Sequence, residues 1–352
     1  MTYKWWARGT TFLGRSLVIF FAGRELLTGQ SAVSIVGGGY IDPSHIDFAP
    51  GQVTTLFLRN VKGPAIQYVA ASGFPLPFTL AGLSVSLRLF SDVAPIPVPI
   101  FSVRQLDNGC PAALPEILSV DPCRLIAVTI QVPTGLTMAL PASPPDPNRR
   151  HELIVSENGQ PGPAFSYFLK QDNIHVVTNC DPIQRFVGED CRPEITHLDG
   201  KLVQGGNPAQ PGEILVVYAF GLGETSPTVP SGSPAPLPPA SLRFPLRITF
   251  NFAPNAPPLW QAPASPTLIF DEAIFAGLAP GFAGLYQVNV RVPEPPAGTA
   301  RCLSANVQSN VTVTLLPGGT FDGARFCVQV PRDPPPAAPL SATGHELRTR
   351  PL

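Results

Sequence analysis

Apolar and polar residues alternate in short runs along most of this chain, and helical spacing is almost absent after the first thirty residues. Short runs with alternation or with many β-branched residues predict β-strands. The runs are Val53–Leu58, Leu83–Leu89, Ile126–Val132, Glu152–Ser156, Ile214–Tyr218, Leu246–Phe250, Tyr286–Val292 and Val311–Leu315. Each ends near Pro, Gly or Asn, which favour turns. The last run alternates strictly, which predicts one buried and one solvated face.

The two halves of the chain repeat the same succession of segments. The matching pairs are Ala49–Gln52 with Gln210–Glu213, Val98–Phe101 with Thr267–Phe270, and Ala127–Pro133 with Tyr286–Pro293. A repeated order of this kind indicates a duplicated unit of about 140 to 160 residues. Because each unit consists of short strands and turns, we expect two tandem β-sandwiches with long loops.

Composition supports a folded chain and argues against nucleic-acid binding. Hydrophobic residues make up 44% of the 352 positions, whereas charged residues make up only 13%. The 45 prolines and 31 glycines therefore punctuate a folded chain, because disorder also requires low hydrophobicity. The net charge is −1, and no basic stripe is present to replace the counterions of a phosphate backbone.

The N-terminus resembles an export signal. Lys4, Arg8 and Arg15 precede the apolar run Leu17–Gly23, and small residues follow near Ser31. This order predicts a signal peptide or membrane-anchoring leader over residues 1–33, and hence an extracellular or cell-surface protein. A buried strand or a wrongly assigned start codon is the alternative. No later run is long enough to cross a bilayer.

Six cysteines form three pairs that are close in sequence. The pairs are Cys110 with Cys123, Cys180 with Cys191, and Cys302 with Cys327. Six cysteines allow 15 connectivities, so the pairing stays open, although an even count in loop-rich sequence is typical of disulfides in an oxidising compartment. Each local bridge would contribute about 3 kcal/mol. A structural zinc site needs a closely spaced Cys knuckle, which is absent, so we expect no metal.

Three segments carry a resemblance to a known family: Phe275–Pro293, Asn207–Gly223 and Val229–Pro236. They resemble the signature of an uncharacterised C-terminal domain family that is abundant in acidobacterial secreted proteins. The resemblance covers residues 40–332 and is specific over 196–315, and the first half is similar to a degenerate partner copy. It implies immunoglobulin-like extracellular modules appended to surface proteins, without catalytic residues or cofactors. The proline-rich stretch 252–266 departs from the family pattern.

The expected fold is all-β, with two tandem immunoglobulin-like β-sandwiches joined by a short disulfide-containing linker. The expected boundaries are a leader at 1–33, a first sandwich at 34–175, a linker at 176–206, a second sandwich at 207–332 and a disordered tail at 333–352. Turn dipeptides such as Asp199-Gly200 and Asn207-Pro208 place the boundary between the sandwiches.

The signature segment has a structural interpretation. Four residues would let the chain reverse tightly: Gly277, Pro280, Gly281 and Gly284. Four apolar residues would plug the end of the sandwich: Phe275, Leu278, Phe282 and Leu285. Tyr286 would bond its hydroxyl back to the backbone, while Gln287 and Asn289 would line the face opposite Val288 and Val290. A ligand site made from the same loop is the alternative.

Few residues offer catalytic or metal-binding chemistry. His197 and Asp199 would share a face of a strand, but the chain has no nucleophile elbow and no H-E-x-x-H motif, so a turn histidine is the simpler interpretation. His45, with Asp42 and Asp47, forms either a metal site or a solvated loop. His151 and His175 flank strand ends and receive no role. Close acidic pairs that calcium would need are sparse: Asp42/Asp47, Glu189/Asp190 and Asp271/Glu272.

Trp260 is the only tryptophan outside the leader, and it lies within the proline-rich loop 252–266. It would either stack on a sugar or cap a core. We therefore expect a non-enzymatic structural or adhesion module, with a carbohydrate- or surface-ligand-binding module as the alternative and a hydrolase as a remote one. The expected partner is an unknown protein or a cell-surface glycan.

Overall fold

The structure is a computed structural model. It describes residues 32–40, 47–63, 67–89, 94–106, 125–136, 151–181, 191–254, 256–258, 268–302, 309–316 and 319–330, and all of them belong to one compact unit, Ala32–Leu352. The leader predicted at 1–33, apart from its last two residues, and the tail predicted at 333–352 lie outside this range.

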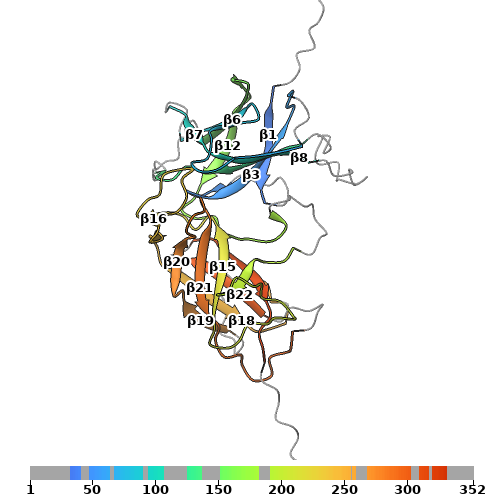
Figure 1. Cartoon of the computed structure of the whole chain (residues 1–352), viewed down its shortest axis with the longest axis vertical. Helices are drawn as coiled ribbons and strands as arrows, with labels where there is room; N and C mark the ends of the chain where they lie inside the picture. Colours follow the sequence, from blue (N-terminus) through green and yellow to red (C-terminus); the bar gives the residue numbers. More distant parts are fainter. Residues whose placement is uncertain are drawn as a thin grey trace, which may run out of the picture. The chain divides into compact units, whose positions relative to one another are not determined.

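The first β-sandwich consists of two sheets (Figure 1). One sheet has the order β1-β3-β9-β8-β4, with β1 (Ser34–Gly39), β3 (Val53–Arg59), β9 (Ile126–Gln131), β8 (Ile100–Gln105) and β4 (Tyr68–Ala70). The other has the order β2-β12-β10-β6-β5, with β2 (Asp47–Phe48), β12 (Phe165–Leu169), β10 (His151–Glu157), β6 (Leu83–Arg88) and β5 (Thr79–Leu80). β7 (Ile96–Val98) pairs with β6, and β11 (Gln160–Pro161) pairs with β10.

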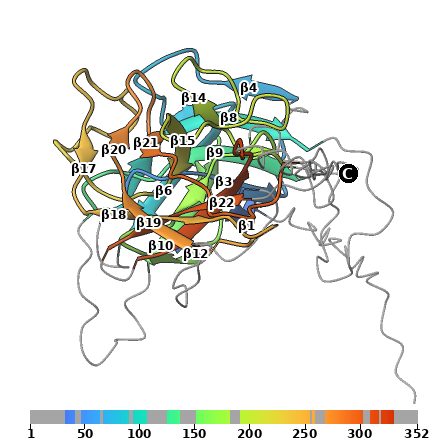
Figure 2. The same ribbon diagram turned by 90° about the horizontal axis from the view of Figure 1, so that it is seen from below.

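The second β-sandwich also has two sheets, and Figure 2 shows β20, β21 and β15 side by side in one of them. That sheet has the order β13-β15-β21-β20-β17-β16, with β13 (His175–Val176), β15 (Ile214–Phe220), β21 (Tyr286–Arg291), β20 (Phe275–Leu278), β17 (Ser241–Leu242) and β16 (Thr225–Ser226). β14 (Ile195–His197) also pairs with β15. The other sheet has the order β19-β18-β22-β23, with β19 (Leu268–Glu272), β18 (Leu246–Asn251), β22 (Ser309–Leu315) and β23 (Phe321–Phe326).

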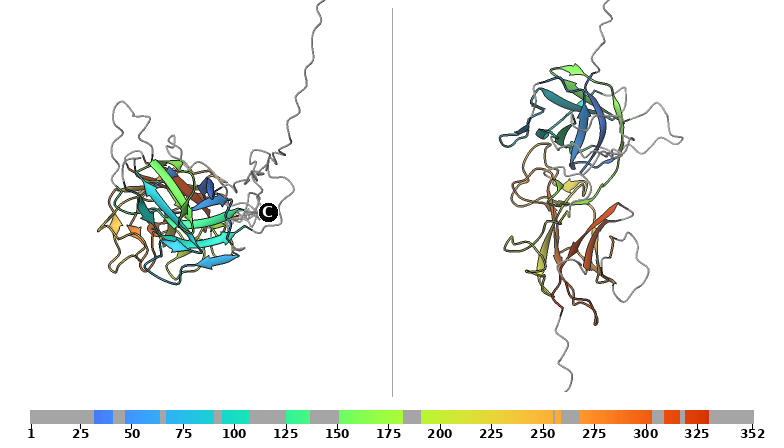
Figure 3. Two further views of the ribbon diagram at one scale, coloured as in Figure 1. Left: turned by 90° about the horizontal axis from the view of Figure 1, so that it is seen from above. Right: turned by 90° about the vertical axis from the view of Figure 1, so that its right-hand side faces the viewer.

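Strand order identifies both sandwiches as immunoglobulin-like. An immunoglobulin sandwich pairs its strands as A-B-E-D in one sheet and C-F-G in the other. β1-β3-β9-β8 and β14-β15-β21-β20 have the first order, while β6-β10-β12 and β18-β22-β23 have the second. The chain therefore forms two tandem immunoglobulin-like β-sandwiches, and the two layers of each can be followed in Figure 3.

The equivalent strands explain the internal repeat. β9 and β21 hold the same place, and each pairs with its neighbour, β3 or β15, through six residue pairs. The matching of Val98–Phe101 with Thr267–Phe270 holds only in part. β7, which ends at Val98, pairs with β6 as β19 pairs with β18, whereas Ile100 and Phe101 already belong to β8, the counterpart of β20.

Each sandwich encloses its own apolar core. Strands with one buried face alternate as expected: every second residue of β6, from Leu83, and of β21, from Tyr286, is buried. The second core includes Leu215, Val217, Ile248, Phe250, Val288, Val290, Val311 and Val313, and the first includes Leu56, Leu58, Val85, Leu87, Val128, Ile130, Leu153 and Val155. Burial of such side chains contributes roughly 1.5–3 kcal/mol each.

The prediction of a solvated face on Val311–Leu315 is wrong. Thr312 and Thr314 in β22 are as fully buried as Val311 and Val313. β22 lies between β18 and β23, and Pro258, after β18, lies close to Gly323 of β23. A Cβ placed on Gly323, the partner of Thr312, would come within 3.1 Å of Pro258. Alternation within one strand cannot reveal a distant segment that covers its polar face.

The segment between the sandwiches is shorter than the predicted linker at 176–206. β12 ends at Leu169 and β13 begins at His175, and both β13 and β14 pair with β15. The Cys180–Cys191 disulfide, with a Cα–Cα distance of 5.3 Å, lies between these two strands. Much of the predicted linker therefore supplies edge strands of the second sandwich. Across the described residues, no helix is long and apolar enough to cross a membrane.

Candidate functional site: the interface between the two sandwiches

The same turn precedes the B strand of each sandwich, which is β3 in the first and β15 in the second. Pro-Gly occupies its centre, and Gly51 and Gly212 have φ values of 77° and 81°, which a type II turn requires at this place. The side chain of the fourth turn residue accepts a hydrogen bond from the backbone N–H of the first. Ala49 donates to Gln52 Oε1 at 2.8 Å, and Gln210 donates to Glu213 Oε2 at 2.7 Å. The duplication thus preserved both the backbone and the side-chain hydrogen bond of the turn.

The remaining polar atoms of Gln52 and Glu213 have different partners. Gln52 Nε2 donates to the hydroxyl of Tyr40 at 2.8 Å, and that hydroxyl donates to the carbonyl of Val53 at 2.9 Å. Glu213 Oε1 lies 2.6 Å from Nδ1 of His197. In the first sandwich the turn therefore supports a residue at the interface, whereas in the second it anchors a local histidine.

The short linker at residues 170–174 contacts both sandwiches. Asn173 donates its backbone N–H to the carbonyl of Gly221 at 2.8 Å and its side-chain N–H to the carbonyl of Asp47 at 2.8 Å. A Cβ on Gly221 would lie 2.0 Å from the Asn173 carbonyl, and one on Gly223 would lie 2.4 Å from that of Gln171. Only glycine fits at these two positions, because the linker backbone occupies the space of a side chain.

Asp172 ties the linker to the second sandwich. Its carboxylate accepts hydrogen bonds from the backbone N–H and the hydroxyl of Thr320, at 2.6 and 2.7 Å. Burial raises the pKa of Asp172, and the two hydrogen bonds from Thr320 oppose that rise. The next residue but one, Ile174, donates its N–H to the same Thr320 hydroxyl at 2.9 Å. The linker is therefore held by side-chain hydrogen bonds as well as by backbone packing.

Residues 229–235 of the second sandwich reach the first. Thr134 donates two hydrogen bonds: its N–H donates to Ser231 Oγ at 2.9 Å, and its hydroxyl donates to the carbonyl of Val229 at 2.8 Å. Gly232 donates its N–H to Gln131 Oε1 at 2.7 Å and accepts from the N–H of Leu76 at 2.8 Å. The hydrogen bonds of Thr134 and Gln131 join segments that lie 95 to 101 residues apart in sequence.

The signature loop also packs on the first sandwich. A Cβ on Gly284, which has a φ of 67°, would lie 2.7 Å from both the Gly51 carbonyl and a methyl group of Val53. By contrast, a Cβ on Gly281, in the same loop and with a φ of 80°, would meet no atom within 4 Å. Gly281 thus serves the local turn, whereas Gly284 permits the contact between sandwiches.

An aromatic stack crosses the interface. The Tyr40 ring lies 3.6 Å from the imidazole of His175 between centroids, at an interplanar angle of 13°. Phe220, at the end of β15, is nearly parallel to Tyr40 at 5.9 Å. Burial raises the pKa of the Tyr40 hydroxyl far above its usual value, so this group stays protonated. The stack adds directional packing to the hydrogen bonds around it.

His175 lies between two carboxylates. Its Nε2 is 2.9 Å from Asp181 Oδ2, and its Nδ1 is 3.5 Å from Asp322 Oδ2. Burial alone would lower the pKa of His175, but the hydrogen bonds and charges of the two aspartates outweigh it and raise the pKa to about 9. The ring is therefore a cation at neutral pH, stacked on Tyr40 and donating from both nitrogens.

A cleft opens beside this stack, between the outer face of the β1-β3-β9-β8-β4 sheet and the second sandwich. Its volume is about 280 Å³. The lining includes Tyr40, Tyr68, Phe101, Phe220, Phe282 and Asp181. Thr55 and Thr129 form part of the same lining, and their hydroxyls are 3.1 Å apart. We call this feature the interdomain cleft.

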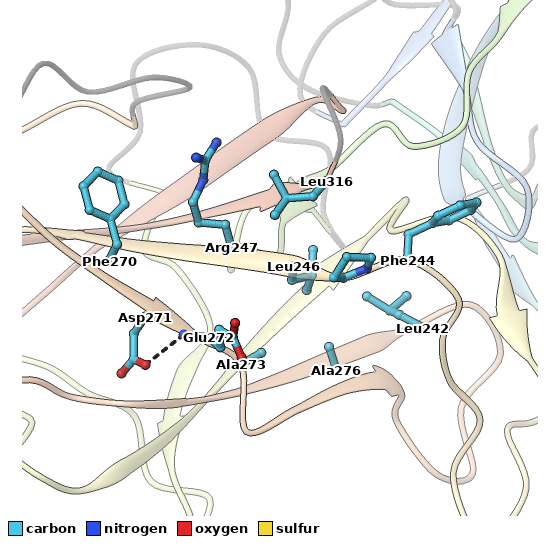
Figure 4. A pocket seen from close by; sticks show the side chains of 11 residues that line it. Leu242, Phe244, Leu246, Arg247, Phe270, Asp271, Glu272, Ala273, Ala276 and Leu316 are labelled. Atoms are coloured by element: carbon cyan, nitrogen blue, oxygen red, sulfur yellow. Dashed lines mark hydrogen bonds between the residues drawn. The ribbon is translucent and has the colours of Figure 1, made fainter.

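A larger groove, of about 630 Å³, runs along β18 and β19 in the second sandwich (Figure 4). Leu242, Phe244 and Ala276 in its wall are partly buried and pack against the second core. Figure 4 shows the side chain of Arg247 and the carboxylate of Asp271 pointing in opposite directions, so no set of polar groups converges there. The groove is the open margin of the core beside the edge strand β19.

His197 and Asp199, expected on one strand face, have separate partners. The ring of His197 contacts Glu213 and, at 3.3 Å, the carbonyl of Asn207. Asp199 pairs with Lys201 at 2.6 Å, which lowers the pKa of the aspartate. The N–H of Gly200 donates to the His197 carbonyl at 3.0 Å, which closes a turn. His197 is thus a turn histidine tied to the Pro211-Gly212 turn.

The signature residues have mostly structural positions. Pro280 and Gly281 form a third Pro-Gly turn, closed by the Phe282 N–H and the Ala279 carbonyl at 3.3 Å. Gly277 lies against the neighbouring strand β17, since its Cβ would be 2.3 Å from the Ala240 carbonyl. The expectation that Phe282 plugs the sandwich end is wrong, because this ring is exposed and lines the interdomain cleft.

Tyr286 is fully buried at the start of β21. Its hydroxyl donates to the carbonyl of Gly223, and burial raises the pKa of the hydroxyl. This residue occupies the E strand, whereas the tyrosine corner of antibody domains lies at the start of strand F. Gln287 and Asn289 are half-buried on the face opposite Val288 and Val290, in agreement with the alternation of the sequence.

Several predicted site residues lie outside the described residues: Trp260, Cys110, Cys123, Asp42, His45, Glu189 and Asp190. Among the remaining cysteines, Cys302 joins Cys327 with a Cα–Cα distance of 5.5 Å. Asp47 contacts Lys170, while Asp271 and Glu272 are exposed on β19. Within the described part of the chain, no group of three or more His, Cys, Asp or Glu residues could hold a metal ion.

Sequence reasoning missed the residues that build the interface. Tyr40, Phe220 and Gln131 sit in ordinary strand-like runs, and His175 was given no role. Asp181, six residues beyond His175, was the only local hint. The other partners, Asp322 and Tyr40, are more than a hundred residues away in sequence, so spacing could not reveal them.

Comparison with known proteins adds little to the strand order. No family model matches the chain, and no curated protein matches it. Among solved structures, a crystal structure of the titin domains Z1Z2 in complex with telethonin matches at 11% sequence identity. That match covers 86% of this chain and 98% of the titin chain, with a TM-score of 0.15. The fold assignment therefore rests on the strand order of the two sandwiches.

Proposed function

We propose that this chain is a non-enzymatic structural or adhesion module of an exported protein, in which the two immunoglobulin-like sandwiches act as a single unit. The observation that carries the proposal is the interface itself. The hydrogen bonds from Gly232 to Gln131 and from Thr134 to Ser231, the linker at 170–174 and the stack of Tyr40 on His175 all join the two sandwiches. A module that spaces or presents other domains gains from such an interface, because independent sandwiches would not transmit orientation.

The resemblance to the acidobacterial secreted family supports the same proposal. The three segments that carry it coincide with residues at the interface: Gly221 and Gly223 hold the linker, Ser231 and Gly232 bond to the first sandwich, and Gly284 packs on it. We infer that the signature encodes the junction between two sandwiches. This inference accounts for a glycine-rich signature that contains no catalytic residue.

The two disulfides within the described residues support export. Cys180–Cys191 and Cys302–Cys327 are bridges of the kind that form and persist in oxidising compartments. The contacts of the two histidines favour a structural role: His197 supports a turn, and His175 is a buried cation held by two aspartates. A histidine that stays protonated at neutral pH cannot serve as a general base.

A matched pair of variants tests whether the sandwiches act as a unit. Gly284→Ala and Gly281→Ala both place a side chain at a positive φ, at a cost of roughly 1–2 kcal/mol. Only Gly284→Ala also introduces a methyl group within 2.7 Å of the first sandwich. We expect one calorimetric unfolding transition for the wild type and Gly281→Ala, and two transitions for Gly284→Ala. Two transitions in the wild type would refute the single unit.

Export and the absence of enzymatic activity need their own test. The full chain with its native N-terminus should be recovered from the periplasm or medium of a Gram-negative host, with Cys180, Cys191, Cys302 and Cys327 protected from alkylation. Cytoplasmic recovery with four reactive thiols would refute export. A panel of hydrolase substrates should show no turnover, and turnover abolished by His197→Ala would refute the non-enzymatic assignment.

A further inference from the structure

Two exposed aromatic side chains line the interdomain cleft. Tyr68 on β4 is 55% exposed, and Phe282 in the signature loop is 57% exposed, although both line the same cavity. Large apolar side chains that remain exposed together commonly mark a binding surface. Three further rings, Tyr40, Phe101 and Phe220, line the cleft between them.

Polar groups on the floor of the cleft suit a ligand with hydroxyl groups. Thr55 and Thr129 face each other across β3 and β9, and Thr54, Ser102 and Asp181 also line the cleft. Hydroxyl groups both donate and accept, so a row of them matches a ligand whose own hydroxyls do the same.

We propose that the interdomain cleft binds a neutral hexose unit of a glycan, with the sugar ring stacked on the aromatic side chains and its hydroxyls bonded to the floor. The C–H faces of a pyranose carry a slight positive charge and match the negative faces of aromatic rings. The volume of about 280 Å³ accommodates one or two sugar rings, and it lies near the lower limit of known ligand pockets.

The cleft is ordered before any ligand arrives. The guanidinium of Arg104 lies 4.7 Å from the centroid of the Tyr68 ring, a cation–π contact that fixes the orientation of this exposed side chain. Tyr40 is held by Gln52 and by stacking on His175. Binding then loses little side-chain entropy, which favours affinity for a small ligand.

This inference rests on the proposed function, because the cleft exists only while the two sandwiches stay together. The experiment therefore uses the full exported chain and reads out binding and unfolding separately. The probe is an array of neutral oligosaccharides that display glucose, galactose, mannose and N-acetylhexosamine termini, with sialylated glycans on the same array. The strongest neutral glycan is then titrated by calorimetry.

Phe270 provides a matched control, since it is an aromatic residue of similar exposure, 52%, that lies on β19 in the other groove. We expect Tyr68→Ala and Phe282→Ala each to weaken glycan binding at least tenfold, and Phe270→Ala to change it less than twofold. Gly284→Ala should abolish binding and split the unfolding transition.

Three results would overturn the proposal. The first is a wild type that unfolds in one transition but binds no neutral glycan. The proposed function as a single unit would then stand. The second is binding that Tyr68→Ala and Phe282→Ala leave unchanged. The third is binding of the dye 8-anilinonaphthalene-1-sulfonate in the cleft without any glycan binding, which would assign the cleft to an apolar ligand. Two transitions in the wild type would instead refute the proposed function.

Discussion

The buried cation at His175 makes the stability of the chain depend on pH in a defined window. The pKa of His175 is raised from its usual 6.5 to about 9 in the folded chain. A group with a raised pKa stabilises the fold fully below its unfolded pKa and loses this contribution as the pH rises through the folded pKa. The contribution should therefore be complete below pH 6.5 and nearly gone by pH 9.

The magnitude follows from the shift and from the burial of the group. The His175 side chain is only 17% exposed, so solvent screens its ion pairs weakly. A difference of this size between folded and unfolded pKa corresponds to about 3 kcal/mol, because one pH unit is worth about 1.4 kcal/mol. Replacement of His175 also leaves Asp181 and Asp322 without the cation between them, which adds to the loss.

The perturbation is His175→Gln, and the assay is urea unfolding from pH 6 to pH 9. We expect the variant to be less stable than the wild type at pH 6 by about 3 kcal/mol or more, and this difference to shrink by about 3 kcal/mol by pH 9. A difference that stays constant over this window would refute a protonated His175. An increase with pH would refute it as well.

His151→Gln is the control for this experiment. Burial lowers the pKa of His151, so the effect of this histidine on stability appears as the pH falls below 6.5. The difference in stability between His151→Gln and the wild type should therefore be flat from pH 6.5 to pH 9. A slope shared by both variants would show that the pH dependence arises elsewhere in the chain.

Three further predictions concern the core and the covalent links. Tyr286→Phe should lower the free energy of unfolding in urea by about 1–3 kcal/mol, because the buried carbonyl of Gly223 loses its donor; an unchanged value would contradict this role. Replacement of Cys302 and Cys327 by serine should cost about 3 kcal/mol by the same measurement, and no loss would show that the bridge is dispensable. Leu56→Ala, in the first core, should cost about 2–5 kcal/mol and lower the melting temperature of both sandwiches together in calorimetry, whereas a shift confined to half of the unfolding enthalpy would show independent sandwiches.

The sequence by itself determined the strands, the turns and the duplication. Alternating apolar residues define β6 and β21, and Pro-Gly at 50–51 and 211–212 defines the turns before the B strands, because these signals act over a few residues. The cysteine pairs 180/191 and 302/327 are also local signals, because the two members of each pair lie close together in sequence. Each depends on neighbours within the same stretch of chain.

Only the tertiary structure decided which residues build the interface. Gly284 and Gly281 are both turn glycines in the sequence, but only Gly284 contacts the first sandwich. His175 lies between Asp181 and, from β23, Asp322, which together raise its pKa, and Phe282 is exposed and lines the interdomain cleft. These roles depend on contacts between segments that are far apart along the chain, and such contacts leave no periodic signal in the sequence.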